Sequence, residues 1–90
     1  MNQRLKDRVA IVVGSTSGIG TTIAEYFAKE GAKVVITGRR KEKGNEVVKK
    51  IVDAGYEASF FQIDVQHPEE CRALIEDTIK KYSKLDILVN

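Results

Sequence analysis

The sequence predicts an α/β fold in which the strands of a parallel sheet alternate with helices. Short apolar, β-branched runs alternate along the chain with longer amphipathic segments of helical period. The first run, Val9–Val13, lacks polar alternation, as is typical of a parallel strand that is covered on both faces. Strand–helix–strand units with short loops imply right-handed crossovers, and therefore a parallel sheet.

The first half of the chain supplies two strands and two helices. After the strand at 9–13 we expect a helix over 18–30, a strand over 33–37 and a helix over 41–54. Gly44 should weaken the first turn of the second helix by about 1 kcal/mol relative to alanine. The apolar positions of the two helices should face inward: Ile19, Ile23, Ala24, Phe27 and Ala28 in the first, and Val47, Val48 and Ile51 in the second.

The second half continues the pattern to give the order βαβαβαβ. We expect a strand over 57–64, a helix that starts at Pro68 and a strand over 85–89. Proline suits the first position of a helix, and the glutamates that follow it complement the positive helix end. The inner face of this third helix should consist of Cys71, Leu74, Ile75, Thr78 and Ile79.

Composition limits the class of protein. The chain has 90 residues, of which 42% are hydrophobic and 31% charged, and this suits one small domain. The net charge of +2 is too small to indicate nucleic-acid binding. The apolar runs are too short for a membrane span, and no signal peptide is visible. A single cysteine excludes an internal disulfide and fits a cytoplasmic location.

A glycine-rich loop separates the first strand from the first helix. Its glycines follow the spacing G-x-x-x-G-x-G, and three hydroxyl residues lie between the first two. Such a turn directs backbone N–H groups and the positive end of the helix dipole at an anion. We therefore predict a Rossmann-type cradle for the pyrophosphate of a dinucleotide, formed by Gly14, Ser15, Thr16, Ser17, Gly18, Ile19 and Gly20. The alternative is a tight turn that binds no ligand.

The chain resembles the short-chain dehydrogenase/reductase family. The matching segments are GSTSGIG at 14–20, TGRR at 37–40, QIDV at 62–65 and LDILVN at 85–90. Their order and spacing agree with the N-terminal part of that family over essentially the whole chain. Many members have threonine where this chain has Val13, which removes a hydroxyl that could hold the loop. The resemblance implies a doubly wound sheet of strand order 3-2-1-4, incomplete at the edge of the fourth strand.

The end of the second strand favours NADP(H) over NAD(H). An acidic residue at this place binds the ribose 2′-hydroxyl of NAD, whereas arginine accommodates the 2′-phosphate of NADP. Here Gly38 is followed by Arg39 and Arg40, and no carboxylate occurs before Glu42. Arg39 can offer a fork of donors to a phosphate. The alternative is that the basic residues are a solvated start to the second helix.

Further cofactor contacts are implied by the resemblance. Asp64 should accept from the exocyclic amine of adenine, and the backbone N–H of Val65 should meet a ring nitrogen. The alternative for Asp64 is a strand-end carboxylate that accepts from nearby backbone amides. Asn90 should border the adenosine ribose and steady the central sheet.

Catalytic residues are not identified within this sequence. In the resembling family a serine and a tyrosine followed four residues later by lysine assist hydride transfer, and no tyrosine of this chain has that lysine. We interpret residues 1–90 as the N-terminal dinucleotide-binding part of a single Rossmann domain, from a longer or truncated polypeptide whose catalytic part is absent. His67 is the only histidine, and we expect no metal site. Cys71 lies on the apolar face of the third helix and is expected in the core rather than as a nucleophile.

Two functions therefore compete. The first is the NADP(H)-binding portion of an oxidoreductase that interconverts a carbonyl and an alcohol on a small molecule. The second is a nucleotide-binding module or truncated fragment without activity of its own. A flavin- or methyl-donor-binding domain is disfavoured by the basic corner, because those ligands carry no 2′-phosphate. An apolar fourth strand at an open edge also predicts self-association or a homo-oligomer.

Overall fold

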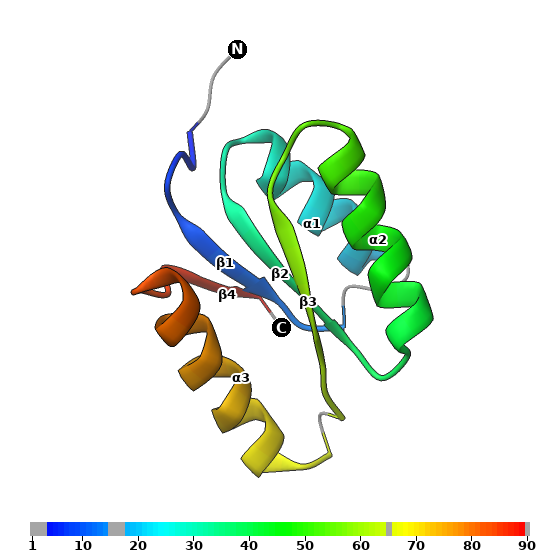
Figure 1. The fold of residues 1–90 in the computed structure, drawn as a ribbon, viewed down its shortest axis with the longest axis vertical. Coiled ribbons are helices and arrows are strands. Elements are labelled where there is room, and N and C mark those ends of the chain that lie inside the picture. The colour runs from blue at the N-terminus through cyan, green and yellow to red at the C-terminus, as the bar shows by residue number, and fades with distance from the viewer. Residues whose placement is uncertain (1–3, 15–17, 65, 90) are drawn as a thin grey trace.

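A four-stranded parallel sheet forms the centre of the molecule (Figure 1). The computed structural model describes residues 4–14, 18–64 and 66–89. The strand order β3-β2-β1-β4 confirms the order expected from the sequence. The elements are β1 (Val9–Val12), α1 (Gly18–Lys29), β2 (Lys33–Gly38), α2 (Lys41–Asp53), β3 (Ala58–Gln62), α3 (Pro68–Tyr82) and β4 (Ile87–Val89).

The two central strands are the most deeply buried. All four residues of β1 and four of the six residues of β2 are buried, which explains why these strands show no polar alternation. Helices α1 and α2 cover one face of the sheet, and α3 covers the other (Figure 1). The side chains of β1 therefore alternate between two cores, so that Ala10 and Val12 face α1 and α2 whereas Ile11 faces α3.

Helix α2 packs closely against β3 because it carries a glycine at the contact. Gly44 is buried, and a methyl group added there would overlap the ring of Phe60. From the sequence alone, this glycine is expected only to weaken the helix. The structure shows that the missing side chain allows the first turn of α2 to approach the edge of the sheet.

Helix α3 covers its face with a narrower stripe than its sequence predicts. Leu74 and Thr78 are buried, and Cys71 and Ile75 lie partly buried beside them. Ile79 was expected on the same inner face but is 45% exposed, so this prediction was wrong. The buried Thr78 hydroxyl donates to the Leu74 carbonyl at 2.7 Å, which satisfies it within the helix.

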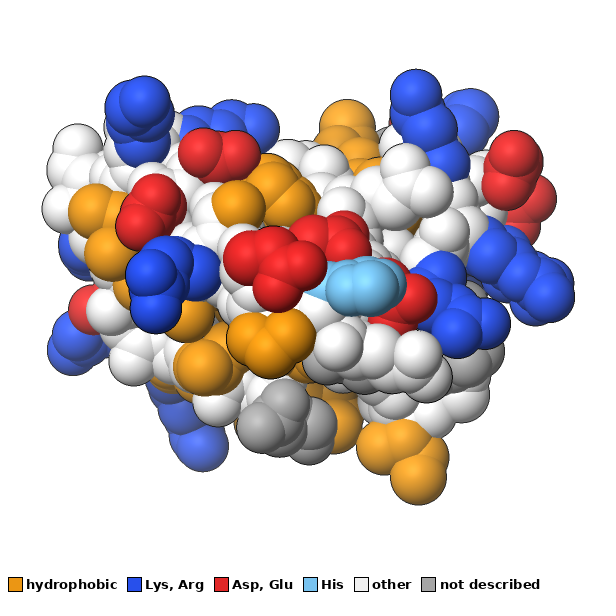
Figure 2. Space-filling model, turned by 90° about the horizontal axis from the view of Figure 1, so that it is seen from below, with side chains coloured by type: hydrophobic (Ala, Val, Ile, Leu, Met, Phe, Trp, Pro, Cys, Tyr) orange, Lys and Arg blue, Asp and Glu red, His pale blue; other side chains and the backbone are white. Residues whose placement is uncertain are grey.

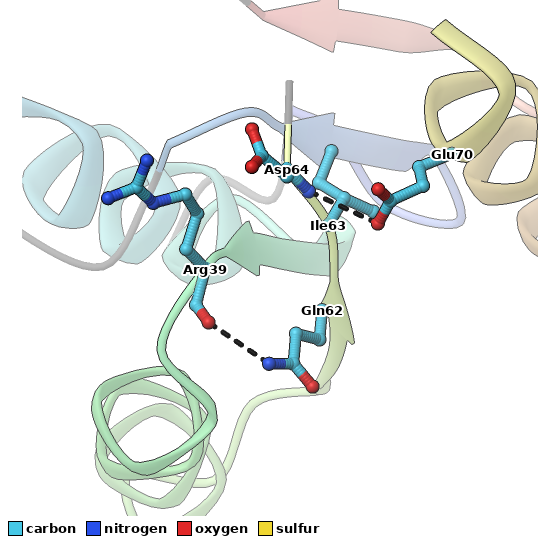
Figure 3. Close-up of a pocket in the computed structure, with 5 residues that line it drawn as sticks. All are labelled: Arg39, Gln62, Ile63, Asp64 and Glu70. Atoms are coloured by element: carbon cyan, nitrogen blue, oxygen red, sulfur yellow. Dashed lines mark hydrogen bonds between the residues drawn. The ribbon is translucent and has the colours of Figure 1, made fainter. Parts of the chain in front are cut away.

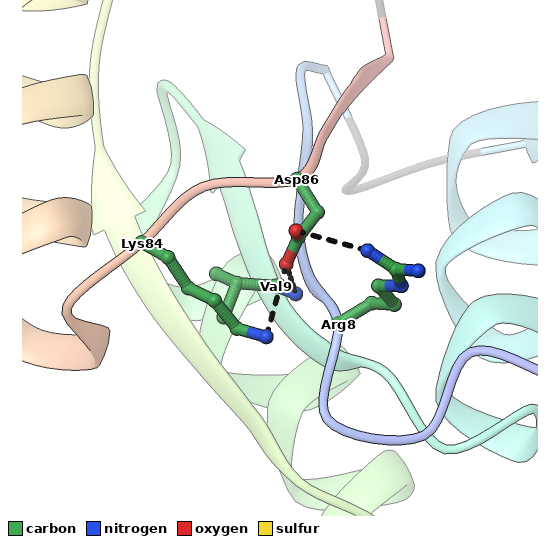
Figure 4. A network of polar contacts seen from close by, with 4 residues as sticks. All are labelled: Arg8, Val9, Lys84 and Asp86. Carbon is green, nitrogen blue, oxygen red and sulfur yellow. Dashed lines mark hydrogen bonds and ion pairs between the residues drawn. The ribbon is translucent and has the colours of Figure 1, made fainter.

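Strand β4 is the shortest, and Asp86 fixes its entry to the sheet. The Asp86 carboxylate accepts from the Val9 backbone N–H at 2.9 Å, and the Asp86 N–H donates to the Val9 carbonyl at 2.9 Å. Arg8 and Lys84 lie 3.4 Å and 3.5 Å from the same carboxylate (Figure 4). At Asp86 the side-chain carboxylate accepts from the Val9 N–H in place of a backbone carbonyl. Regular strand pairing therefore covers 87–89 rather than the predicted 85–89.

Candidate functional site

The glycine loop begins where β1 ends, at the carboxyl edge of the sheet. Gly14 and Gly18 have φ values of +71° and +53°, in the left-handed region that favours glycine. A Cβ at either position would meet nothing within 4 Å, so their requirement for glycine arises from the backbone and not from crowding. The first turn of α1 contains no acidic residue that would neutralise the positive helix end. This combination leaves room and a favourable field for an anion.

A threonine from the neighbouring strand holds the start of this loop. The hydroxyl of Thr37 accepts from the Gly14 N–H at 3.1 Å and donates to the Val12 carbonyl at 3.2 Å. Thr37 is fully buried at the end of β2. The sequence predicts a loop that lacks a holding hydroxyl because of Val13, and Thr37 was not predicted to replace it. A polar residue that ends an otherwise apolar strand was the available signal.

The basic corner lies beside the loop, at the turn from β2 to α2. Arg39 and Arg40 are both exposed. In the part of the chain that the structure describes, no carboxylate lies within 4.0 Å of either guanidinium. Arg40 is the N-cap residue of α2 and makes no side-chain capping bond. Within the described residues, neither arginine therefore has an acidic partner.

An open cavity of about 390 Å³ lies between this corner and the start of α3 (Figure 3). Figure 3 shows Arg39 and Glu70 approaching from opposite sides, with Asp64 between them. Its lining residues are Arg39, Gln62, Ile63, Asp64 and Glu70. The cavity thus has a cationic side and an acidic side, which suits a ligand with an anionic group at one end and hydrogen-bond donors at the other.

Asp64 and Glu70 form the acidic side of the cavity. Asp64 accepts from the Gln66 N–H at 3.0 Å, and its own N–H donates to the Glu70 carboxylate at 3.3 Å. The structural role that the sequence left open for Asp64 is therefore present. A carboxylate has further lone pairs, so the proposed contact with adenine stays a prediction.

Acidic side chains also surround the histidine on this face of the molecule (Figure 2). His67 lies 3.9 Å from Asp64 and 3.7 Å from Glu69, and its side chain is 54% exposed. Within the described residues there is no group of three or more histidine, cysteine or acidic side chains that could hold a metal ion. No described helix is both long enough and apolar enough to cross a membrane.

Seven of the twelve predicted site residues, Gly20 and Arg40 among them, lie in the described part of the chain. Gly14, Gly18, Arg39 and Asp64 all lie at or beyond the carboxyl ends of their strands, as expected. Ile19 is 79% exposed, so its expected place on the packed face of α1 was wrong. The predictions for Ser15, Thr16, Ser17, Val65 and Asn90 lie outside the described residues. Gln62 and Glu70 also line the cavity but were not predicted as site residues.

The topology and its glycine turn define a Rossmann-like parallel α/β protein. The model of the short chain dehydrogenase family matches residues 8–90. This chain belongs to the short-chain dehydrogenase/reductase family.

Curated relatives and solved structures agree with this assignment. An uncharacterized oxidoreductase from Staphylococcus saprophyticus is 48% identical over 89 residues, covering 96% of this chain and 37% of the relative. A 3beta-hydroxysteroid dehydrogenase from Mediterraneibacter gnavus is 41% identical over 87 residues, covering 97% of this chain and 32% of the relative. A metagenomic short-chain oxidoreductase solved in complex with NADP has a TM-score of 0.90 at 36% identity, covering 93% of this chain and 38% of that one. The chain thus spans about a third of the length of these relatives.

Proposed function

We propose that this chain is the NADP(H)-binding portion of an oxidoreductase that interconverts a carbonyl and an alcohol by hydride transfer. Residues 1–90 would form the N-terminal dinucleotide-binding part of one Rossmann domain. When bound, the nicotinamide cofactor supplies or accepts the hydride. The residues of this chain bind and orient that cofactor, and we assign none of them to the chemical step.

The position and charge of the Arg39 guanidinium support the choice of NADP(H) over NAD(H). It borders the cavity at the end of β2, and no carboxylate in the described part of the chain lies within 4.0 Å of it. A cation without an acidic partner favours a phosphate over a hydroxyl. The relative solved in complex with NADP supports the same choice. Arg40 would add to the positive potential beside the 2′-phosphate.

The remaining contacts follow the shape of the site. The open space and positive φ at Gly14 and Gly18 suit a pyrophosphate at the start of α1, together with the other loop residues named from the sequence. Asp64, with the Val65 N–H, would receive adenine, and Asn90 would border the ribose. The partly buried single cysteine fits the reducing cytoplasm that we propose as the compartment.

Fluorescence titration with NADPH and NADH tests the cofactor assignment. It uses the intact protein, by which we mean the product of the whole reading frame that contains residues 1–90. We expect tighter binding of NADPH. Arg39→Ala should weaken NADPH binding by about ten- to a hundredfold, because a charge-assisted contact is lost, and should change NADH binding little. Arg72→Ala removes an exposed arginine from α3 and serves as the matched control. Tighter binding of NADH by the unmodified protein would overturn the assignment.

A nucleotide-binding module without catalytic activity is the second candidate. The three tyrosines of this chain lack a lysine four residues later, and this observation favours it for residues 1–90 taken alone. The reading frame that contains the chain separates the two candidates. A serine followed by Tyr-x-x-x-Lys supports the enzyme, whereas a stop codon directly after Asn90 supports the module.

We also propose that residues 1–90 self-associate through β4. This strand pairs only with β1 in the described sheet, and its Leu88 side chain is 51% exposed. An apolar edge with unpaired backbone groups is a template for another strand. Gel filtration of the 90-residue chain should show oligomers or aggregates, and a stable monomer would contradict the proposal.

A further inference from the structure

The side chain of Gln62 holds the backbone from which Arg39 extends. Its Nε2 donates to the Arg39 carbonyl at 3.0 Å (Figure 3). Gln62 is the last residue of β3 and pairs with Gly38, the last residue of β2. The contact therefore joins the ends of two strands at the edge of the cavity.

This contact lies just beyond the regular hydrogen bonding of the sheet. The Ile63 N–H donates to the Gly38 carbonyl at 3.0 Å, which is the last backbone bond between these two segments. On the C-terminal side of Arg39, the Gly44 N–H donates to the Arg40 carbonyl at 3.0 Å, and this bond begins α2. Among the described residues, no backbone N–H donates to the Arg39 carbonyl that lies between them. The Gln62 amide thus replaces a backbone donor at this peptide.

The orientation of this peptide sets the direction in which the Arg39 side chain leaves the backbone. Figure 3 shows the guanidinium extending away from Gln62, toward the side of the cavity where Asp64 lies. Arg39 is exposed and has no carboxylate in the described residues to hold its charged end. Without the Gln62 bond, a long side chain on a free peptide would lose more rotational freedom when it binds a ligand.

We propose that Gln62 is a positioning residue that sets the preference for a 2′-phosphorylated cofactor through Arg39. This inference rests on the proposed NADP(H) function. Gln62 also lines the cavity, so it has a second possible route to the ligand, namely direct contact. The two routes differ in one respect: an effect that passes through Arg39 disappears when the guanidinium is removed.

A double-mutant cycle in the intact protein separates these routes. The variants are Gln62→Met, which keeps the length of the side chain without its donor, Arg39→Ala, and the pair together. NADPH and NADH affinities are measured by fluorescence titration. We expect Gln62→Met to weaken NADPH binding by about three- to tenfold, as for the loss of one hydrogen bond, and NADH binding by less than about twofold. In the Arg39→Ala background, Gln62→Met should have no further effect.

Gln66→Met provides the matched control. The Gln66 side chain is exposed and does not line the cavity, so the same chemical change should leave both affinities unaltered. Two outcomes would overturn the positioning role of Gln62 without affecting the NADP(H) assignment. Gln62→Met could weaken the binding of NADPH and NADH equally, or it could weaken NADPH binding as much in the Arg39→Ala background as in the unmodified protein. If Arg39→Ala leaves NADPH binding unchanged, the role of Gln62 through Arg39 fails. The NADP(H) assignment itself fails if the unmodified protein binds NADH more tightly than NADPH.

Discussion

The hydroxyl of Thr37 bridges the last residue of β1 and the first glycine of the loop. It accepts from the Gly14 N–H at 3.1 Å and donates to the Val12 carbonyl at 3.2 Å. Since Thr37 is fully buried in β2, these bonds tie the position of the loop to the centre of the sheet. A rigid strand thereby determines where the glycine turn begins.

Thr37→Val keeps the shape of this side chain and removes both hydrogen bonds. A buried polar group that loses its partner costs about 1–3 kcal/mol, so we expect a loss of unfolding free energy in this range. Weaker NADPH binding should accompany it, because the loop N–H groups lose their fixed starting point. Chemical denaturation and fluorescence titration measure the two effects.

Thr37→Ser is the control, since it retains the hydroxyl and removes only a methyl group. It should preserve cofactor affinity even where packing lowers its stability. If Thr37→Ser and Thr37→Val weaken NADPH binding equally, the hydroxyl does not position the loop.

Gly44→Ala should destabilise the protein, although alanine is the better helix former. In an open helix this change would stabilise by about 1 kcal/mol. Here the new methyl group overlaps the Phe60 ring, and overpacking of this kind costs about 1–3 kcal/mol. Thermal unfolding followed by circular dichroism gives the sign of the change.

Relief of the overlap provides a second test at this contact. Combining Gly44→Ala with Phe60→Val should cost less than the sum of the two single changes, because the smaller side chain leaves space for the methyl group. Additive losses would show that the contact between α2 and β3 does not require glycine.

The order of the elements could be predicted because burial on both faces leaves a strong pattern. The runs that became β1 and β2 are apolar without alternation, and the helices of the chain have glycine or proline at or next to their ends. Details that depend on helix rotation were less accessible. Ile19 and Ile79 fit the helical period but are 79% and 45% exposed. Tyr82, further along α3, still packs against the core, so Ile79 is exposed because of the rotation of the helix and not because the helix has passed the sheet.

Contacts between side chains and backbone of different strands could not be predicted at all. The bond of Gln62 to the Arg39 carbonyl joins residues 23 positions apart, and so does the bond of the Gly14 N–H to Thr37. Both depend on the register of parallel neighbours, which the pattern of one strand does not contain. The sequence therefore indicated the glycines and arginines of the candidate site but not the residues that position them.

Leu88→Lys should reduce self-association of the 90-residue chain. Charged side chains on an edge strand oppose pairing with a second strand, and Leu88 is 51% exposed on β4. Sedimentation velocity over a range of concentrations measures the oligomer fraction. Val52→Lys, which changes a 49% exposed residue on α2, is the matched control and should leave association unaltered. An equal effect of the two variants would place the contact elsewhere.

The stability conferred by Asp86 should depend on pH. The Val9 N–H lowers the pKa of this carboxyl below its ordinary value, and Lys84 and Arg8 act in the same direction against the effect of partial burial. Because the folded pKa lies below the unfolded one, the stabilisation is fully present above about pH 4, the ordinary range for aspartate. It is lost as the pH falls through the lower folded value.

Asp86→Asn removes the charge while keeping the size of the side chain. It should lower the unfolding temperature at pH 7, and the difference from the unmodified protein should shrink as the pH falls below about 4. Asp77→Asn, on the exposed surface of α3, should show a smaller difference at pH 7, because no ion pair within the described residues involves Asp77. A difference for Asp86→Asn that persists unchanged down to pH 2.5, on the order of one unit below the ordinary pKa, would show that the Asp86 charge does not anchor β4.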